Sequence, residues 1–257
     1  MTHDHQANGG LILLAVAVGY EILATLDRRP WPWWRTAFFL TGCAALAAGF
    51  APWPPDFRAH MLQHLLIGML APLLLVLGAP VTLLLRTLPR PAARAVGRLM
   101  RHRFVHAVAH PVVALTLNLG GLALLFLTPL YAATRDEPRL HLLVHLHFLL
   151  AGYLFAWVIA GPDPAPKRPS VPTRLVILGV AIAFHSILSQ LMYAGVLVDL
   201  PVGADERRGG AELMYYGGDL AELLLAAALV AGWRRLPDRT RPRLHRDPYA
   251  TDLGGCA

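Results

Sequence analysis

The chain contains seven apolar runs, each long enough to cross a lipid bilayer as an α-helix, which takes about 17–25 mostly apolar residues. A closed barrel is the only other structure that can span a bilayer. It needs alternating strands of about ten residues, and these Leu-, Ala- and Val-rich runs do not alternate. We therefore predict an all-α membrane bundle of seven transmembrane helices, covering about 11–26, 35–51, 61–85, 111–131, 141–160, 174–199 and 211–233.

These helices leave almost no sequence for a soluble domain, so we expect residues 1–257 to form a single integral membrane domain. Hydrophobic residues make up 56% of the chain and charged residues only 15%, a balance that ordinary soluble domains do not have. Residues 86–110 place arginines between apolar side chains and predict a basic interfacial segment on the cytoplasmic membrane surface. Residues 234–257 are expected to form a cytoplasmic tail.

Positive charge is distributed unevenly between the two sides of the predicted bundle. The segments that follow the first, third, fifth and seventh runs, with Arg35 and Arg174 counted at their ends, hold 18 of the 23 Lys and Arg residues. Because cytoplasmic loops are enriched in Lys and Arg, this pattern places the N-terminus outside and the C-terminus in the cytoplasm. The net charge of +7 then reflects topology, and we expect a lipid bilayer but no nucleic acid as partner.

Histidine pairs mark the expected outer ends of two of these helices. His60 and His64 stand four residues apart in "HMLQH", and His141 and His145 do so in "HLLVH". Residues at this spacing lie about 5–6 Å apart on one helix face, so each pair can offer two imidazoles to one ion. An ionisable group inside a membrane is costly unless it is paired or ligating. We therefore predict an outward-facing metal site formed by these four histidines.

Further ionisable or soft side chains in the bundle are candidates for secondary metal ligands or for partners that orient the imidazoles. The last run carries Asp219 and, one turn deeper, Glu222. The sixth run carries His185 near its middle, where a hydrogen-bonded core is an equally good explanation. Met61 and Met192 offer thioethers, although packing in an apolar core is the ordinary role of buried methionine.

The composition also limits the identity of the metal. The chain has only two cysteines, so a thiolate cage is excluded. Neutral imidazole with an optional thioether suits copper, and imidazole alone also suits zinc or iron. His102, His106 and His110 have a similar spacing, but they lie among arginines, where like charge opposes a cation. No Ser or Cys has a recognisable activating partner, so we expect no enzyme.

Three segments resemble the CtaG family of bacterial membrane proteins: "HMLQHLLIGMLAPLLLVLGAPVTLLLR", "HLHFLLAGYLFAWVIAGPDP" and "MYYGGDLAELLLAAALVAGW". The resemblance covers roughly residues 35–233. It implies a non-enzymatic metallochaperone in the bacterial inner membrane that helps to place copper in the binuclear centre of cytochrome c oxidase. Its partners would be an oxidase subunit and a copper donor on the outer side.

The resemblance also assigns residues. His60 and His64 match the paired histidines of the family's third helix, and His141 and His145 match the pair of the fifth. Asp219 matches the acidic position of the last helix, and it is followed here by Leu220 where many members have Gln.

Two other functions remain open at this stage. A membrane redox protein could use His64 and His145 as the two axial ligands of a haem. A copper or proton transporter could use a path along His64, His185, Asp219 and Glu222, but it would need polar groups that continue to the cytoplasmic face.

Overall fold

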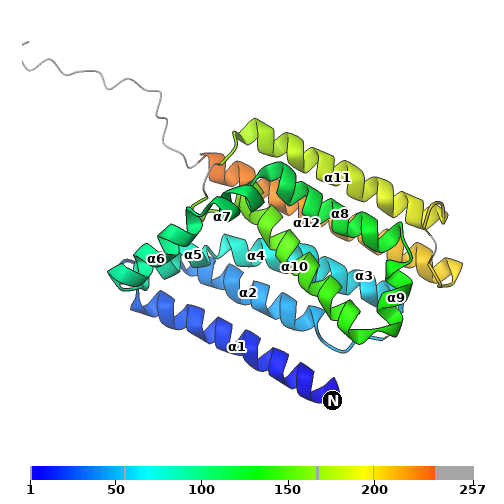
Figure 1. The fold of residues 1–257 in the computed structure, drawn as a ribbon, viewed down its shortest axis with the longest axis horizontal. Helices are drawn as coiled ribbons and strands as arrows, with labels where there is room; N and C mark the ends of the chain where they lie inside the picture. The colour runs from blue at the N-terminus through cyan, green and yellow to red at the C-terminus, as the bar shows by residue number, and fades with distance from the viewer. Residues whose placement is uncertain (1, 55, 166–167, 199, 235–257) are drawn as a thin grey trace, which may run out of the picture.

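The computed structural model describes residues 2–54, 56–165, 168–198 and 200–234, and within these ranges the chain forms helices and no strands. Figure 1 shows the long helices lying side by side along one axis, with α1 at one edge of the bundle and α11 at the other. The predicted all-α fold is confirmed. Apart from its first residue, the expected tail over 234–257 lies outside the described residues.

The helices have the following bounds: α1 Thr2–Leu26, α2 Trp33–Gly49, α3 Phe57–Leu65, the π-helical turn η1 Leu66–Leu70, α4 Ala71–Leu77, α5 Pro80–Thr87, α6 Arg90–Met100, α7 Arg103–Val108, α8 Pro111–Phe126, α9 Leu130–Asp136, α10 Pro138–Ala160, α11 Val171–Ala194 and α12 Ala204–Arg234. Among the described residues, five segments are long and apolar enough to cross a membrane, and α8 with α9 makes a sixth if counted as one span. The five are Gly9–Leu26, Phe57–Thr87, Pro138–Ala160, Val171–Ala194 and Ala204–Trp233.

The structure thus supports five or six spans where the sequence predicts seven. The remaining predicted span corresponds to α2, whose 17 residues are at the lower limit of the roughly 17–25 that a crossing helix needs. The predicted helix over 111–131 is not continuous, because α8 and α9 meet at an angle of 74°. Pro129 precedes α9 and cannot donate the hydrogen bond that would continue α8.

The helix α2 packs between α1 and α4 by close contacts at small residues. The rings of Tyr20 and Phe39 stack with centroids 3.9 Å apart. A Cβ at Gly42 would lie 2.9 Å from Leu75 Cγ, and one at Gly78 would lie 2.8 Å from Phe39 Cβ. Glycine at these two positions therefore allows the backbones to approach more closely than any larger residue would.

The third predicted span changes its winding below the histidines. Pro72 has no N–H to donate to the Gly68 carbonyl four residues earlier, and the chain forms the π-helical turn η1 just before it. On α10, Gly152 lies against this same carbonyl, so closely that a Cβ there would overlap the Gly68 oxygen. Pro72 and Gly152 together therefore fix how α10 sits against the segment that continues α3.

A buried carboxylate holds the start of α5. Asp163, which follows α10 and is 1% exposed, accepts hydrogen bonds from the backbone nitrogens of Val81 (3.1 Å) and Thr82 (2.7 Å) and from the Thr82 hydroxyl (2.6 Å). Burial raises the pKa of the Asp163 carboxyl, although the hydrogen bonds from Thr82 and Val81 act in the opposite direction. Asp163 thus caps the N-terminus of a helix that is distant in sequence.

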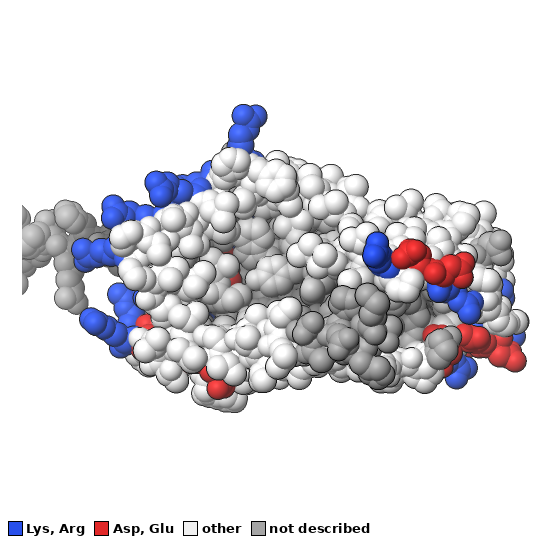
Figure 2. Space-filling model, turned by 60° about the horizontal axis from the view of Figure 1, so that its bottom comes forward, with Lys and Arg blue, Asp and Glu red and all other residues white. Residues whose placement is uncertain are grey.

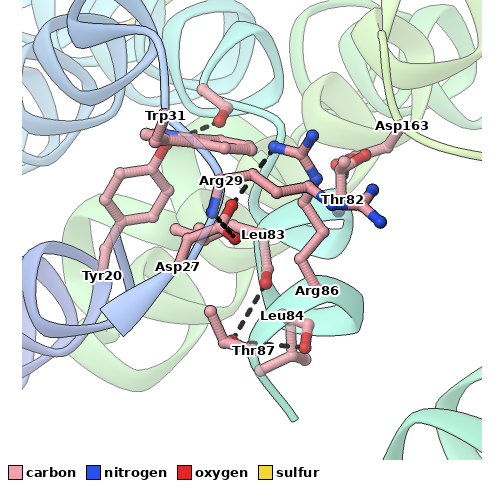
Figure 3. Close-up of polar contacts among 11 residues, drawn as sticks. Tyr20, Asp27, Arg29, Trp31, Thr82, Leu83, Leu84, Arg86, Thr87 and Asp163 are labelled. Carbon is pink, nitrogen blue, oxygen red and sulfur yellow. Dashed lines mark hydrogen bonds and ion pairs between the residues drawn. The ribbon is translucent and has the colours of Figure 1, made fainter. Parts of the chain in front are cut away.

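The last turns of α1 and the segment after it are tied to the same region. Figure 3 shows Tyr20 and Trp31 on one side of Arg86, and Asp163 beside Thr82 on the other. The Tyr20 hydroxyl donates to the Gly78 carbonyl at 2.7 Å and accepts from Trp31 Nε1 at 3.1 Å. Arg86 forms an ion pair with Asp27 at 3.2 Å. These contacts fasten the end of α1 to Gly78, just before α5, and to the last turn of α5.

The basic segment after α5 forms α6 and α7, neither of which has a buried residue. Arg90, Arg94 and Arg98 lie on α6, and Arg101 directly follows its last residue. Figure 2 shows Lys and Arg gathered at the end of the molecule that carries α5, α6 and α7, whereas acidic side chains join basic ones at the opposite end. The two ends of the bundle therefore differ in charge.

Candidate metal centre

The beginnings of α3 and α10 position the histidines at the end of the bundle opposite α6 (Figure 1). Asp56 caps α3 by accepting a hydrogen bond from the Ala59 nitrogen at 2.6 Å. Glu206, from the first turn of α12, accepts from the Phe57 nitrogen at 2.5 Å. Since two of the free N–H groups of this helix end are satisfied, the first turn of α3 is held in place and His60 with it.

Three imidazoles from two helices converge at this end. The ring centroids of His141 and His145, one turn apart on α10, are 4.2 Å from each other. The His60 ring on α3 lies 5.7 Å from that of His141 and 5.9 Å from that of His145. One ring nitrogen from each residue can be chosen so that all three lie within 4.8 Å of one another. We call these three residues the outer histidine cluster.

Burial makes this cluster unusual for polar groups. His60 is 9% exposed and His145 is 4% exposed, and the Nε2 atoms of both are buried without a hydrogen-bond partner among the described residues. An unpartnered buried polar atom costs about 1–3 kcal/mol, so two of them side by side are unfavourable unless another group binds there. Imidazole nitrogens with free lone pairs are good ligands for first-row transition metals.

The structure does not bring His64 into this cluster. Its side chain is 5% exposed, one turn deeper along α3, and its ring packs edge-on against Phe148 with centroids 4.5 Å apart. The predicted four-histidine site is therefore realised geometrically by His60, His141 and His145 only. The i,i+4 spacing places His60 and His64 on one face of α3. At the level of His64, however, α10 presents Phe148 and not a histidine.

The acidic and imidazole groups of the deeper bundle pair with one another. His185 on α11 approaches Glu222 on α12, with 3.4 Å between Nδ1 and Oε1. The Ser186 hydroxyl donates to Asp219 at 3.5 Å. None of these four residues belongs to the outer histidine cluster. Asp219 and Glu222 are thus one turn apart, as expected, and contact α11 instead of the three clustered rings.

The two predicted thioether ligands are fully buried. Met61 and Met192 are both 0% exposed, and Met214 on α12 has the same burial. All three belong to one apolar cluster that also contains Phe57 and Phe126. Packing between α3, α11 and α12 accounts for their positions.

The cluster also has neighbours that the sequence pattern does not indicate. Tyr131 on α9 lies edge-on to His60 with ring centroids 5.0 Å apart, and Phe50 lies edge-on to His145 at 6.0 Å. Tyr131 lies in the first turn of the short helix α9 and Phe50 directly follows α2, and such short segments carry no periodic signal. Their aromatic rings shield the imidazoles, and the carboxylates of Asp56 and Glu206 at the same end favour the approach of a cation.

The three histidines of the basic segment have a different role. His102 accepts a hydrogen bond from the Phe104 nitrogen at 3.2 Å, and His110 accepts from Val112 at 3.3 Å. His106 approaches the His102 carbonyl at 3.3 Å. The rings of His102 and His110 therefore cap the beginnings of α7 and α8, and His106 lies within α7, so none of the three is needed as a metal ligand.

Fold and site together define a class: a helical protein with several membrane-length apolar helices and a buried three-imidazole cluster near one end. The family described as "Cytochrome c oxidase caa3 assembly factor (Caa3_CtaG)" matches residues 18–236, and the chain belongs to this family. The resemblance found in the sequence is confirmed, and the family's description names an assembly factor for cytochrome c oxidase.

The curated relatives are mycobacterial. Uncharacterized proteins of Mycobacterium bovis and Mycobacterium tuberculosis are each 33% identical over 93% of this chain, and one of Mycobacterium leprae is 32% identical over 94%. The chain spans 41% of the length of each of these relatives. No solved structure matches it.

Proposed function

We propose that this protein is a non-catalytic copper-binding assembly factor, which holds copper at the outer histidine cluster and passes it to an oxidase subunit. The observation that carries the proposal is the convergence of His60, His141 and His145, which each offer one ring nitrogen within 4.8 Å of the others. Two of their Nε2 atoms are buried and have no hydrogen-bond partner in the described part of the chain. Membership of the oxidase assembly family supplies the acceptor.

The donor set fits copper that must be released again. The cluster consists of neutral nitrogen ligands, which suit copper, zinc and iron, without a thiolate that would favour very tight binding. The only cysteine among the described residues, Cys43, is buried in α2. Copper is the cargo of this site and not a resident cofactor, so a three-imidazole cluster at one end of a bundle is suited to exchange.

The charge distribution supports an outward-facing site in a bacterial inner membrane. The end with α5, α6 and α7 is basic, as expected for a cytoplasmic surface, and the histidine cluster lies at the opposite end (Figures 1 and 2). In this orientation the N-terminus is outside, and the copper donor and the oxidase acceptor approach from the outer side. We also propose that α2, although short, completes a seven-span bundle, since it packs between α1 and α4.

The geometry favours a metal ion over a haem between His64 and His145. A bis-histidine haem needs two imidazoles facing each other across the porphyrin plane. The His64 ring packs against Phe148 at 4.5 Å and the His145 ring against His141 at 4.2 Å. Each prospective axial ligand is thus engaged with its own neighbour.

A transport function has less support. Below Glu222 the interior is an apolar cluster that includes Leu225, Leu229 and Ile177. A transported ion would need polar groups through this region.

The test is an anaerobic Cu(I) competition titration of the detergent-purified protein and of single Ala variants at His60, His141 and His145. We expect the wild type to bind copper without a Soret band and each variant to lose binding at this cluster. The matched control is His147→Ala, because His147 lies on the same helix and bonds instead to the Leu117 carbonyl at 3.1 Å. Unchanged copper affinity in all three cluster variants, or a Soret band in the wild type, would refute the proposal.

A further inference from the structure

A second set of polar groups lies deeper in the bundle, apart from the outer histidine cluster. His64, His185 and Glu222 are each about 5% exposed and come from α3, α11 and α12. Each has one buried side-chain atom that finds no hydrogen-bond partner within the described ranges: Nδ1 of His64, Nε2 of His185 and Oε2 of Glu222. Three such atoms in the middle of an apolar bundle need a physical explanation.

The contact between His185 and Glu222 determines which edge of the His185 ring is free. Nδ1 lies 3.4 Å from the Glu222 oxygen Oε1, and in the tautomer that forms this hydrogen bond Nδ1 donates its proton to the carboxylate. Nε2, on the opposite edge of the ring, then keeps its lone pair and has no partner. A histidine held by a carboxylate through one nitrogen while the other remains free is the usual arrangement of a metal-ligating imidazole.

The second imidazole comes from α3. α12 packs against both α3, which carries His64, and α11, which carries His185. Two glycines allow this convergence: a Cβ at Gly218 would collide with the His185 ring, and one at Gly217 would meet Leu65, the neighbour of His64. The Gly217-Gly218 pair thus brings α12 close to α3 at Leu65 and to α11 at His185.

We propose that His64 and His185 form a second, membrane-embedded copper subsite, in which Glu222 is a positioning residue that orients His185. The proposal rests on the proposed function in its choice of copper as the ion. The subsite is distinct from the outer histidine cluster, because those three rings share no ligand with it. A protein with both sites holds two ions at different depths.

The experiment is a count of copper ions per chain, by metal analysis after anaerobic Cu(I) loading and removal of weakly bound metal. We expect two ions for the wild type, one for His185→Ala or His64→Ala, one for His145→Ala, and none for the double variant His145→Ala/His185→Ala. Ser186→Ala is the matched control, because Ser186 neighbours His185 but bonds to Asp219; it should retain two ions.

The role of Glu222 is tested with two substitutions of similar size. Glu222→Gln keeps an oxygen that accepts the His185 Nδ1–H, and it should leave binding at the inner subsite close to wild type. Glu222→Leu removes this acceptor and should weaken the second binding step by about 10- to 100-fold. Neither substitution should change the first step. Equal affinities for all three proteins would overturn the positioning role.

The outcomes separate this inference from the proposed function. If His145→Ala loses all copper while His185→Ala and His64→Ala behave as wild type, the outer cluster stands and the inner subsite is refuted. If His185→Ala loses an ion while the outer-cluster variants keep both, the subsite stands and the outer cluster is refuted. A wild type that binds a single ion contradicts the second subsite. Monodisperse elution and an unchanged melting temperature of the metal-free variants control for misfolding.

Discussion

The contact between Gly152 and the Gly68 carbonyl leads to a prediction about the metal centre at a distance from its ligands. Substitution of Gly152 by alanine would place a Cβ in overlap with the Gly68 oxygen, 3.0 Å from the Gly68 carbonyl carbon and 3.2 Å from Pro72 Cγ. The obstacle is backbone and a proline ring, neither of which can rotate away. Relief therefore requires α10 to move from η1 by about 1 Å, and overpacking of this kind costs about 1–3 kcal/mol.

The displacement acts on the outer histidine cluster because His141 and His145 lie on the same helix. Three imidazole nitrogens bound to one ion at about 2.0–2.1 Å are roughly 3.5 Å apart, whereas in this structure they lie within 4.8 Å of one another. A displacement of α10 away from η1 and α3 would separate His141 and His145 from His60, so the added methyl group opposes metal binding. If the strain of about 1–3 kcal/mol opposes binding, affinity falls by about 5- to 150-fold.

The assay is the Cu(I) competition titration combined with thermal unfolding in detergent. Gly152→Ala should have a lower melting temperature and weaker copper binding than the wild type, with all ligands still present. Gly179→Ala is the matched control, because Gly179 is on α11 and nothing lies within 4 Å of a Cβ there; it should be neutral or slightly stabilising. Wild-type melting and affinity in Gly152→Ala would show that this contact does not set the position of α10.

Three further predictions concern the two ends of the bundle. For Asp163, the folded protein holds its proton above the ordinary pKa of 3.8, so stability should fall as pH rises from there through the raised pKa. Asp163→Asn should flatten this dependence in melting temperatures recorded from pH 4 upwards. Tyr20→Phe removes the bond to Gly78 and leaves Trp31 Nε1 without its acceptor, which should cost about 1–2 kcal/mol in denaturant unfolding. Asp56→Ala removes the cap of α3 and should cost about 1 kcal/mol, with greater amide exchange in the first turn; unchanged exchange would contradict the role of this cap.

The sequence predicts the helical fold because its signals are local. Apolar runs of membrane length identify the long helices, and the spacing of His141 and His145 places them on one face of α10 whatever that face contacts. The break between α8 and α9 is less predictable, since Pro129 lies near the end of an otherwise continuous apolar run. The length of α2 is a similar case, because its ends are set by proline- and tryptophan-rich turns and not by a change in hydropathy.

Which ligands meet is a property of packing, and the sequence cannot supply it. His60 and His64 have identical local patterns, yet one contacts His141 and the other contacts Phe148. The difference arises from the depth at which α10 crosses the α3 segment, which depends on Pro72, η1 and Gly152 together. The pairing of His185 with Glu222 likewise requires α11 and α12 to be antiparallel neighbours, and no spacing within one helix encodes that.

The two sets of histidines differ in how they are held, and this bears on how copper could be exchanged. The outer rings have aromatic neighbours, Tyr131 and Phe50, and no carboxylate bonded to an imidazole, so their orientation can adjust when an ion enters or leaves. His185 is oriented by Glu222 and confined by the backbone at Gly218. A ligand held in this way needs less reorganisation when an ion binds, so the free-energy cost of ordering it is smaller. The inner position should therefore retain copper longer than the outer one. Slower release from the inner subsite, measured as a second phase when a chelator is added to the loaded wild type and absent from His185→Ala, would support this order; a single phase in both proteins would contradict it.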